Sequence, residues 1–132
     1  MSLLIAATTA NAEADYEYLQ AVQIATLGKS ANLYMRDGLS APTNEGQPDK
    51  TDVSTARLVM MAIERGNQVK ILTGNDALSA CSLAGTANSE DMRRQIQPPT
   101  KTDLMPIYDR MITAFGSVVF TTCMHRNNPS QG

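Results

Sequence analysis

Four short apolar runs alternate with longer segments of helical periodicity along the chain. Within each run the apolar residues follow one another without regular polar interruptions, which is typical of strands covered on both faces. We therefore expect β-strands at residues 3–8, 31–35, 68–72 and 117–122.

Helical periodicity marks the segments between these runs, where apolar residues recur three or four positions apart. Residues that favour helix caps precede the later segments, and glycines follow as stop signals. We expect helices over residues 13–27, 52–66, 76–83 and 103–116, with caps at Thr51 or Asp52, at Asn75 or Asp76, and at Asp103. Residues 40–50 are rich in Pro, Gly, Asn and Asp and predict a loop.

Strands that alternate with helices predict parallel pairing through right-handed crossovers. The expected fold is a three-layer α/β/α sandwich with a mostly parallel sheet. We expect one domain over residues 1–126 and a flexible tail at 127–132. Because ligands bind outside the carboxyl ends of such strands, the predicted functional rim comprises residues 8–12, 36–40, 73–82 and 122–125.

Six polar or glycine residues of this rim are candidates for a pocket. The helix that begins near Asn11 can bind a small anion, and Asp37 can place a carboxylate beside the loop that carries Cys81. An ordinary turn is the alternative reading of Asp37, and we favour it. Backbone amides of residues 73–79 can stabilise a thiolate. The predicted pocket residues are Asn11, Asp37, Thr73, Gly74, Asp76 and Ser79.

The N-terminal apolar run has a second reading. Residues 3–7, followed by Ala10-Asn11-Ala12, resemble the apolar stretch and small-residue cleavage site of a secretion signal. A complete signal begins with positively charged residues, and nothing before Lys29 is basic. We favour a buried first strand and a cytoplasmic protein, in which both cysteines remain reduced.

Composition and charge narrow the classes of function. The 132 residues are 42% hydrophobic, which predicts a folded domain with a sizeable core. Eleven basic and thirteen acidic residues give a net charge of -2 without a basic cluster, so we expect no nucleic-acid partner. No apolar run is long enough to span a membrane.

Cofactor motifs are also missing from the sequence. The only histidine, His125, lies two residues after Cys123, which is below the ligand count of a zinc site. Neither a Gly-x-Gly-x-x-Gly nor a P-loop pattern follows the first predicted strand. We therefore expect neither a metal nor another cofactor.

Cys81 is the residue on which the functional prediction depends. It lies on the predicted rim, where an exposed thiolate can act as a nucleophile. It also lies near helical spacing with Leu78, and reduced cysteine is among the most buried residue types. No Lys, Arg or His occurs within six residues on either side, so the local sequence favours packing over reactivity.

The order and spacing of these pieces resemble the DsrE/DsrF-like family, which includes sulfur-relay proteins that help modify tRNA and their YchN-like relatives. The resemblance rests on residues 3–8, 31–39, 69–72 and 116–121. It implies a parallel sheet of about five strands, assembly into trimers or hexamers, and persulfide chemistry at a cysteine at or close to the end of the third strand. Here that position reads Thr73-Gly74, and Cys81 follows about eight residues later.

Two functions follow as alternatives. In the first, Cys81 is the catalytic residue of a sulfur carrier, which accepts sulfane sulfur from a donor protein and passes it to an acceptor protein. In the second, the chain is a non-catalytic homo-oligomeric binding or scaffold domain that keeps the fold without the site.

Overall fold

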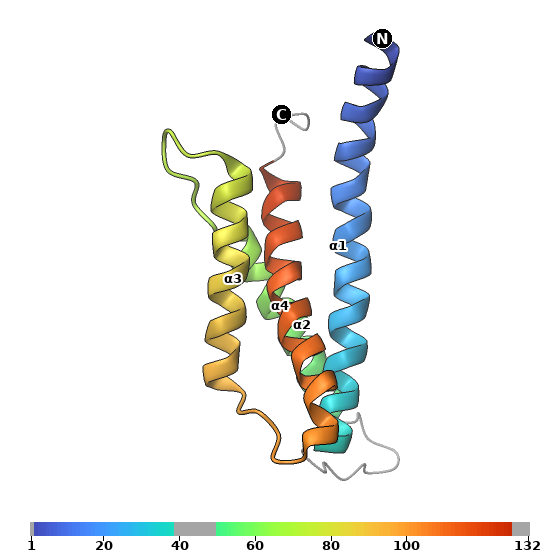
Figure 1. The fold of residues 1–132 in the computed structure, drawn as a ribbon, viewed down its shortest axis with the longest axis vertical. Coiled ribbons are helices and arrows are strands. Elements are labelled where there is room, and N and C mark those ends of the chain that lie inside the picture. The colour runs from blue at the N-terminus through green and yellow to red at the C-terminus, as the bar shows by residue number, and fades with distance from the viewer. Residues whose placement is uncertain (1, 39–49, 128–132) are drawn as a thin grey trace.

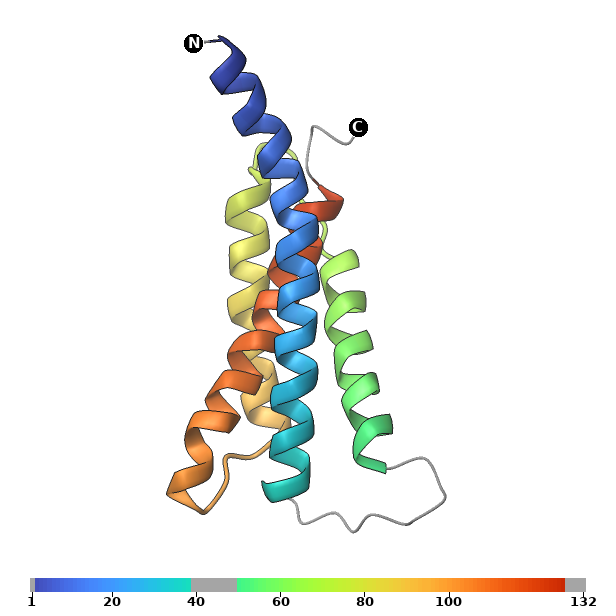
Figure 2. The ribbon, with the colours of Figure 1, turned by 90° about the vertical axis from the view of Figure 1, so that its right-hand side faces the viewer.

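The computed structural model describes residues 2–38 and 50–127, with the side chains of residues 16–36 and 51–127. These residues form an up-down-up-down bundle of four helices (Figures 1 and 2). These are α1 (Ser2–Gly38), α2 (Lys50–Asn67), α3 (Ala77–Gln95) and α4 (Met105–Arg126), and the 3-10 turn η1 (Thr102–Leu104) precedes α4. The described residues contain no strand, so the expected α/β sandwich and its DsrE-like sheet are wrong.

Helix α1 contains two of the four predicted strands, at residues 3–8 and 31–35. Its buried face passes through Leu27, Ala31 and Tyr34, which recur at helical spacing. Gly28 does not end the helix, because α1 continues to Gly38. The run at residues 31–35 is apolar enough for a strand, but its buried positions follow a period of 3.6.

Helices α2 and α3 begin close to their predicted starts. The prediction for α2 is confirmed to within two residues, and Asp76 is confirmed as the N-cap of α3. The predicted strand at residues 68–72 is an irregular connection between them. Helix α3 continues past Gly85 to Gln95, through a polar segment whose sequence predicts no element.

Helix α4 packs against each of the other three helices. Its residues 117–122, predicted as a strand, are almost entirely buried within this central helix. A helix surrounded by others is apolar on most faces, so its sequence shows neither a polar side nor a clear period. That is why a buried strand and a buried helix could not be told apart here.

Gly116 was predicted to end the last helix, but it lies inside α4, where that helix packs closely against α3. A Cβ placed there would overlap with the Ser89 side chain and would lie 2.6 Å from the carbonyl oxygen of Gly85. Gly85 occupies the matching position on α3, where a Cβ would lie 2.9 Å from the carbonyl oxygen of Gly116. Both glycines therefore let the two helix backbones come together.

The main core lies around the first half of α4. Tyr34 and Tyr108 place their ring centroids 5.4 Å apart, and Phe115 is fully buried above them along α4. The two tyrosine hydroxyls donate to the carbonyl oxygens of Gln97 and Ile96, at 3.0 and 2.5 Å. We call Tyr34, Tyr108 and Phe115 the aromatic core.

Arg65 links three helices beside this core. From α2, its guanidinium lies 5.6 Å from the centroid of the Phe115 ring on α4. The same group donates to Asn88 at 2.9 Å and to Asp91 at 2.7 Å, both on α3. The hydrogen bond from Arg65 is the main cause that lowers the pKa of Asp91 below its ordinary value of 3.8.

Two predictions concern residues outside the described ranges. The loop predicted at residues 40–50 falls there except for Lys50, which begins α2, and so does most of the tail predicted at 127–132.

Candidate functional site

The candidate site begins at the connection from α2 to α3, where five of the sequence-predicted site residues lie. The connection turns at Thr73-Gly74, and Gly74 has a φ of +93°, which glycine adopts without strain. The Asn75 amide donates to the carbonyl oxygen of Leu72 at 3.0 Å and closes the turn. The chain then enters α3 at Asp76.

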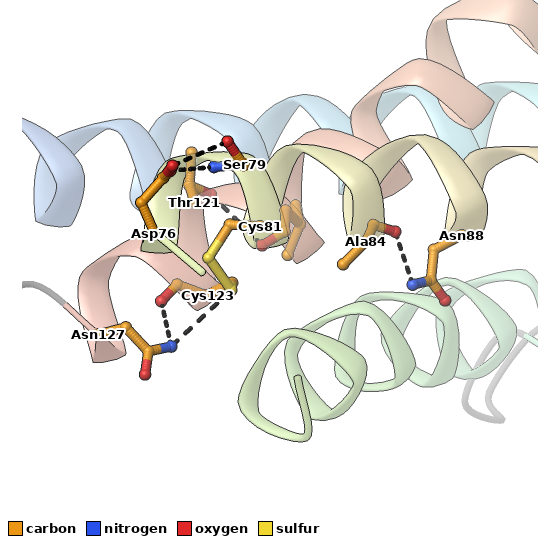
Figure 3. The surroundings of a disulfide bond; sticks show 9 residues. Asp76, Ser79, Cys81, Ala84, Asn88, Thr121, Cys123 and Asn127 are labelled. Atoms are coloured by element: carbon orange, nitrogen blue, oxygen red, sulfur yellow. Dashed lines mark hydrogen bonds between the residues drawn. A yellow bond between two sulfur atoms is a disulfide. The ribbon is translucent and has the colours of Figure 1, made fainter. Parts of the chain in front are cut away.

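Asp76 caps α3 through its side chain. Its carboxylate accepts a hydrogen bond from the Ser79 backbone amide at 2.7 Å and another from the Ser79 hydroxyl at 3.1 Å (Figure 3). These bonds lower the pKa of Asp76, with the backbone amide of Ser79 as the largest cause. The amide of Ser79 is therefore used by the helix cap, and it is not free to stabilise a thiolate at Cys81.

Cys81 lies in the second turn of α3, with its sulfur bonded to that of Cys123 near the end of α4 (Figure 3). The two Cα atoms are 5.6 Å apart, and both side chains are fully buried. The expectation that the two cysteines remain reduced is therefore wrong for this structure. In this state Cys81 has no thiol to ionise.

A small apolar cluster covers the disulfide. Tyr16 from α1, Val69 from the α2–α3 connection, and Phe120 and Met124 from α4 all pack against it. Asn127 closes this end of α4, because its side-chain amide donates to the carbonyl oxygen of Cys123 at 2.8 Å. We call Cys81, Cys123 and these covering side chains the disulfide cluster.

The other two predicted pocket residues, Asp37 and Asn11, form no pocket with the residues around Cys81. Asp37 lies in the last turn of α1, at the end of the bundle opposite to the start of α3 (Figure 1). Asn11 lies within α1 rather than at the start of a helix. The predicted cleft that gathers Asp37, Thr73 and Cys81 does not form, because it required a parallel sheet.

The described surface includes an open groove and a mainly apolar hollow. One, of about 340 Å³, is an open groove between α3 and α4, lined mainly by small side chains. The other, of about 550 Å³, lies along α2 and is mainly apolar. The first is lined by Ser82, Gly85, Thr86, Ser89, Thr113, Gly116, Ser117 and Phe120, and the second by Val53, Ala56, Arg57, Met60, Met61 and Glu64.

Among the described residues no three His, Cys, Asp or Glu side chains lie close enough together to hold a metal ion. None of the described helices combines the length and the apolarity needed to cross a membrane.

Sequence reasoning missed Cys123 as the partner of Cys81. The available signal was the even number of cysteines, each at helical spacing with apolar neighbours. Both cysteines lie on the predicted rim, and the expected cytoplasmic location, in which cysteines remain reduced, argued against a bond between them. Once both residues are on antiparallel helices that touch, the bond is within reach.

Comparison with models of known protein families, with curated proteins and with solved structures finds no match for this chain. The resemblance to the DsrE/DsrF-like family thus stays a prediction from the sequence. The architecture that it implied is the part that the structure contradicts.

Proposed function

We propose that the chain is a disulfide-stabilised helical module of an oxidising compartment, and that it works by binding. The observation that carries this proposal is the fully buried bond between Cys81 and Cys123. Disulfides form and persist outside the reducing cytosol, and small domains use them to add stability to a limited core. The proposal replaces the expected cytoplasmic location.

The surface of α2 supports the binding role. Val53 and Met60 are exposed, and Met60 has 55% of its surface accessible. Arg57 and Glu64 flank them at helical spacing. Exposed methionine suits contact surfaces because its side chain is flexible and polarisable.

The partner that we propose for this face is a second copy of the chain, in line with the predicted trimer or hexamer. Closed symmetric assembly is the usual outcome for a small domain that keeps an apolar face on its surface. Light scattering should therefore report an oligomer, and Met60→Glu should shift it toward the monomer. Leu83→Glu on α3, where Leu83 is 72% exposed, is the matched control. If light scattering shows that the wild-type protein is a monomer, the proposed self-association through α2 is wrong.

The sulfur-carrier function remains an untested prediction with a definite requirement. Cys81 can accept sulfur only after the disulfide is reduced, because a thiolate is the attacking species. A buried pair resists that reduction more than an exposed one does, since the reductant must reach the sulfur.

Thiol labelling separates the two functions. With the binding module, the purified chain should show no reactive thiol, either native or unfolded, until a reductant is added. After incubation with a persulfide donor, its mass should stay unchanged. Free thiols in the unfolded, unreduced chain would contradict the proposal, and a sulfur adduct that Cys81→Ser abolishes would favour the carrier.

A further inference from the structure

The exposed side of α2 carries a charge pattern that is complementary to itself. Arg57 and Glu64 are both exposed, and both line the mainly apolar hollow on this helix. Seven residues make nearly two helical turns, so these two side chains lie on one face and about 10 Å apart along the helix axis. Met60 and Met61 lie between them and line the same hollow. The face therefore has a positive end, an apolar middle and a negative end.

The bundle itself uses neither charge. Within the described part of the chain, no ion pair or side-chain hydrogen bond joins Arg57 or Glu64 to another residue. Arg65, the neighbour of Glu64, is instead paired with Asp91 on α3. Helix α2 forms one edge of the bundle in Figure 2, so a partner can reach its outer face without displacing another helix. Both charges are available to a partner.

The hollow has the layout that one helix offers to a side chain of a facing helix. In knobs-into-holes packing a side chain inserts between four residues of the opposite helix, which are related by steps of three and four along the chain. Arg57, Met60, Met61 and Glu64 have this spacing, and all four line the hollow. Met60 is exposed, and its side chain is unbranched and flexible, so the Met60 side chain of a second copy can fill the hollow.

The order of the charges selects the direction in which two α2 helices can pair. In an antiparallel pair centred between Met60 and Met61, position 57 of each copy lies opposite position 64 of the other. Arg57 then meets Glu64 of the second copy twice, once on each side of the methionines. In a parallel pair in register, arginine would face arginine and glutamate would face glutamate, and like charges across an interface are unfavourable. The pattern therefore favours the antiparallel pair.

We propose that two copies of the chain associate through antiparallel α2 helices about a two-fold axis, with reciprocal Arg57–Glu64 ion pairs around a shared Met60 contact. This inference rests on the self-association proposed above, and it adds the direction, the symmetry and the residues that select the partner. A two-fold contact uses the same patch on both copies, so this face joins subunits in pairs. It is compatible with a dimer, or with a hexamer built from dimers, but not with a cyclic trimer.

Charge reversal in the full-length, oxidised chain tests this geometry. Arg57→Glu and Glu64→Arg should each place like charges opposite one another in the pair, and each should raise its dissociation constant about tenfold at low salt. Sedimentation equilibrium measures this constant. Arg110→Glu on α4 and Glu90→Arg on α3 are the matched controls, because they change the net charge equally at exposed positions outside the hollow. These two variants should associate as the wild type does.

A mixture of the two single variants gives a sharper test. In an antiparallel pair of Arg57→Glu with Glu64→Arg, the introduced glutamate meets the introduced arginine, and the native Glu64 meets the native Arg57. The mixture should therefore form mixed pairs about as readily as the wild type associates, although each variant alone associates weakly. The double variant Arg57→Glu/Glu64→Arg should associate with itself and avoid the wild type. Native mass spectrometry identifies which chains are paired.

The possible outcomes separate this inference from the self-association on which it rests. If Met60→Glu dissociates the oligomer but the charge reversals act like their controls, α2 remains the contact and the antiparallel pairing is wrong. Preferential pairing of the wild type with the double variant would indicate parallel helices and overturn the inference. A wild-type trimer would also overturn it, because a two-fold contact cannot close a ring of three. A wild-type monomer would overturn both proposals.

Discussion

The two ends of the bundle are held together in different ways. At one end the aromatic core joins α1 to α4, and its hydroxyls bond to the chain just after α3. At the other end the disulfide cluster contains one covalent bond and a thinner apolar cover from α1, α4 and the α2–α3 connection. The first end depends on buried volume and the second on a cross-link.

This difference shows how a short chain can stabilise a four-helix bundle with few aromatic residues. The sequence has two Phe, four Tyr and no Trp, and Tyr34, Tyr108 and Phe115 are gathered in one core. A bond between distant positions lowers the entropy of the unfolded chain without the need for bulky side chains. The disulfide thus stabilises the end that has less aromatic packing.

The largest effect should come from the aromatic core. Phe115→Ala removes a fully buried ring and the surface on which Arg65 rests, so we expect the free energy of unfolding to fall by about 3–5 kcal/mol. Urea unfolding followed by circular dichroism measures it. Leu83→Ala, at an exposed site, should change it by at most about 0.5 kcal/mol. Equal effects of the two changes would mean that the core is misplaced.

Removal of the cross-link should cost somewhat less. The disulfide joins residues 42 positions apart, and replacing both cysteines by alanine should lower the free energy of unfolding by about 2–4 kcal/mol. Calorimetry with and without reductant gives an independent value: reductant should lower the melting temperature of the wild type and leave the double variant unchanged. A wild type that is insensitive to reductant would show that the bond contributes nothing to this end.

A single hydrogen bond sharpens the comparison within the aromatic core. Tyr108→Phe keeps the ring but leaves the carbonyl oxygen of Ile96 without its donor, at an expected cost of about 0.5–1.5 kcal/mol. The same change at Tyr34 removes the donor to Gln97 and should cost less, because Gln97 is exposed and water can replace the hydroxyl. Chemical denaturation of both variants compares them, and the reverse order would contradict this account.

Acid should lower the stability of the bundle through both Asp76 and Asp91. The pKa values of Asp76 and Asp91 are lowered in the folded state, by Ser79 and Arg65 respectively. Each carboxylate therefore contributes stability above its unfolded pKa, near 3.8, and that contribution is lost as the pH falls through the lower folded value. Melting curves between neutral pH and pH 2 should show a smaller decline for Asp76→Asn and Asp91→Asn than for the wild type. If the melting temperatures of both variants fall with pH as steeply as that of the wild type, these two carboxylates do not cause the loss of stability in acid.

Local signals in the sequence predicted some elements well. The polar cap at Asp76 and the end of α2 near Gly66 follow from signals within a few residues, and the structure agrees with both, whereas Thr51 and Asp52, the predicted caps of α2, lie within its first turn. Such signals depend on backbone amides close by in the chain, so the packing of distant helices does not alter them.

Signals that depend on distant contacts led to the wrong fold. Gly116 resembles a helix stop, but its real constraint is the backbone of Gly85 on another helix. The run at residues 117–122 is apolar because three helices surround it, and that cause is not visible in the run itself. The bond between Cys81 and Cys123 also depends on a distant contact, because it forms where α3 and α4 lie side by side, and the expected cytoplasmic location had argued against it.

The bond between Cys81 and Cys123 also closes a covalent ring. Most of α3, the irregular residues 96–101, η1 and most of α4 lie between the two cysteines in the chain. A protease that cuts the exposed backbone near Gln97 would therefore leave two fragments still joined through sulfur. They would migrate as one species until a reductant is added, and a nick at this end of the molecule need not release any part of the bundle.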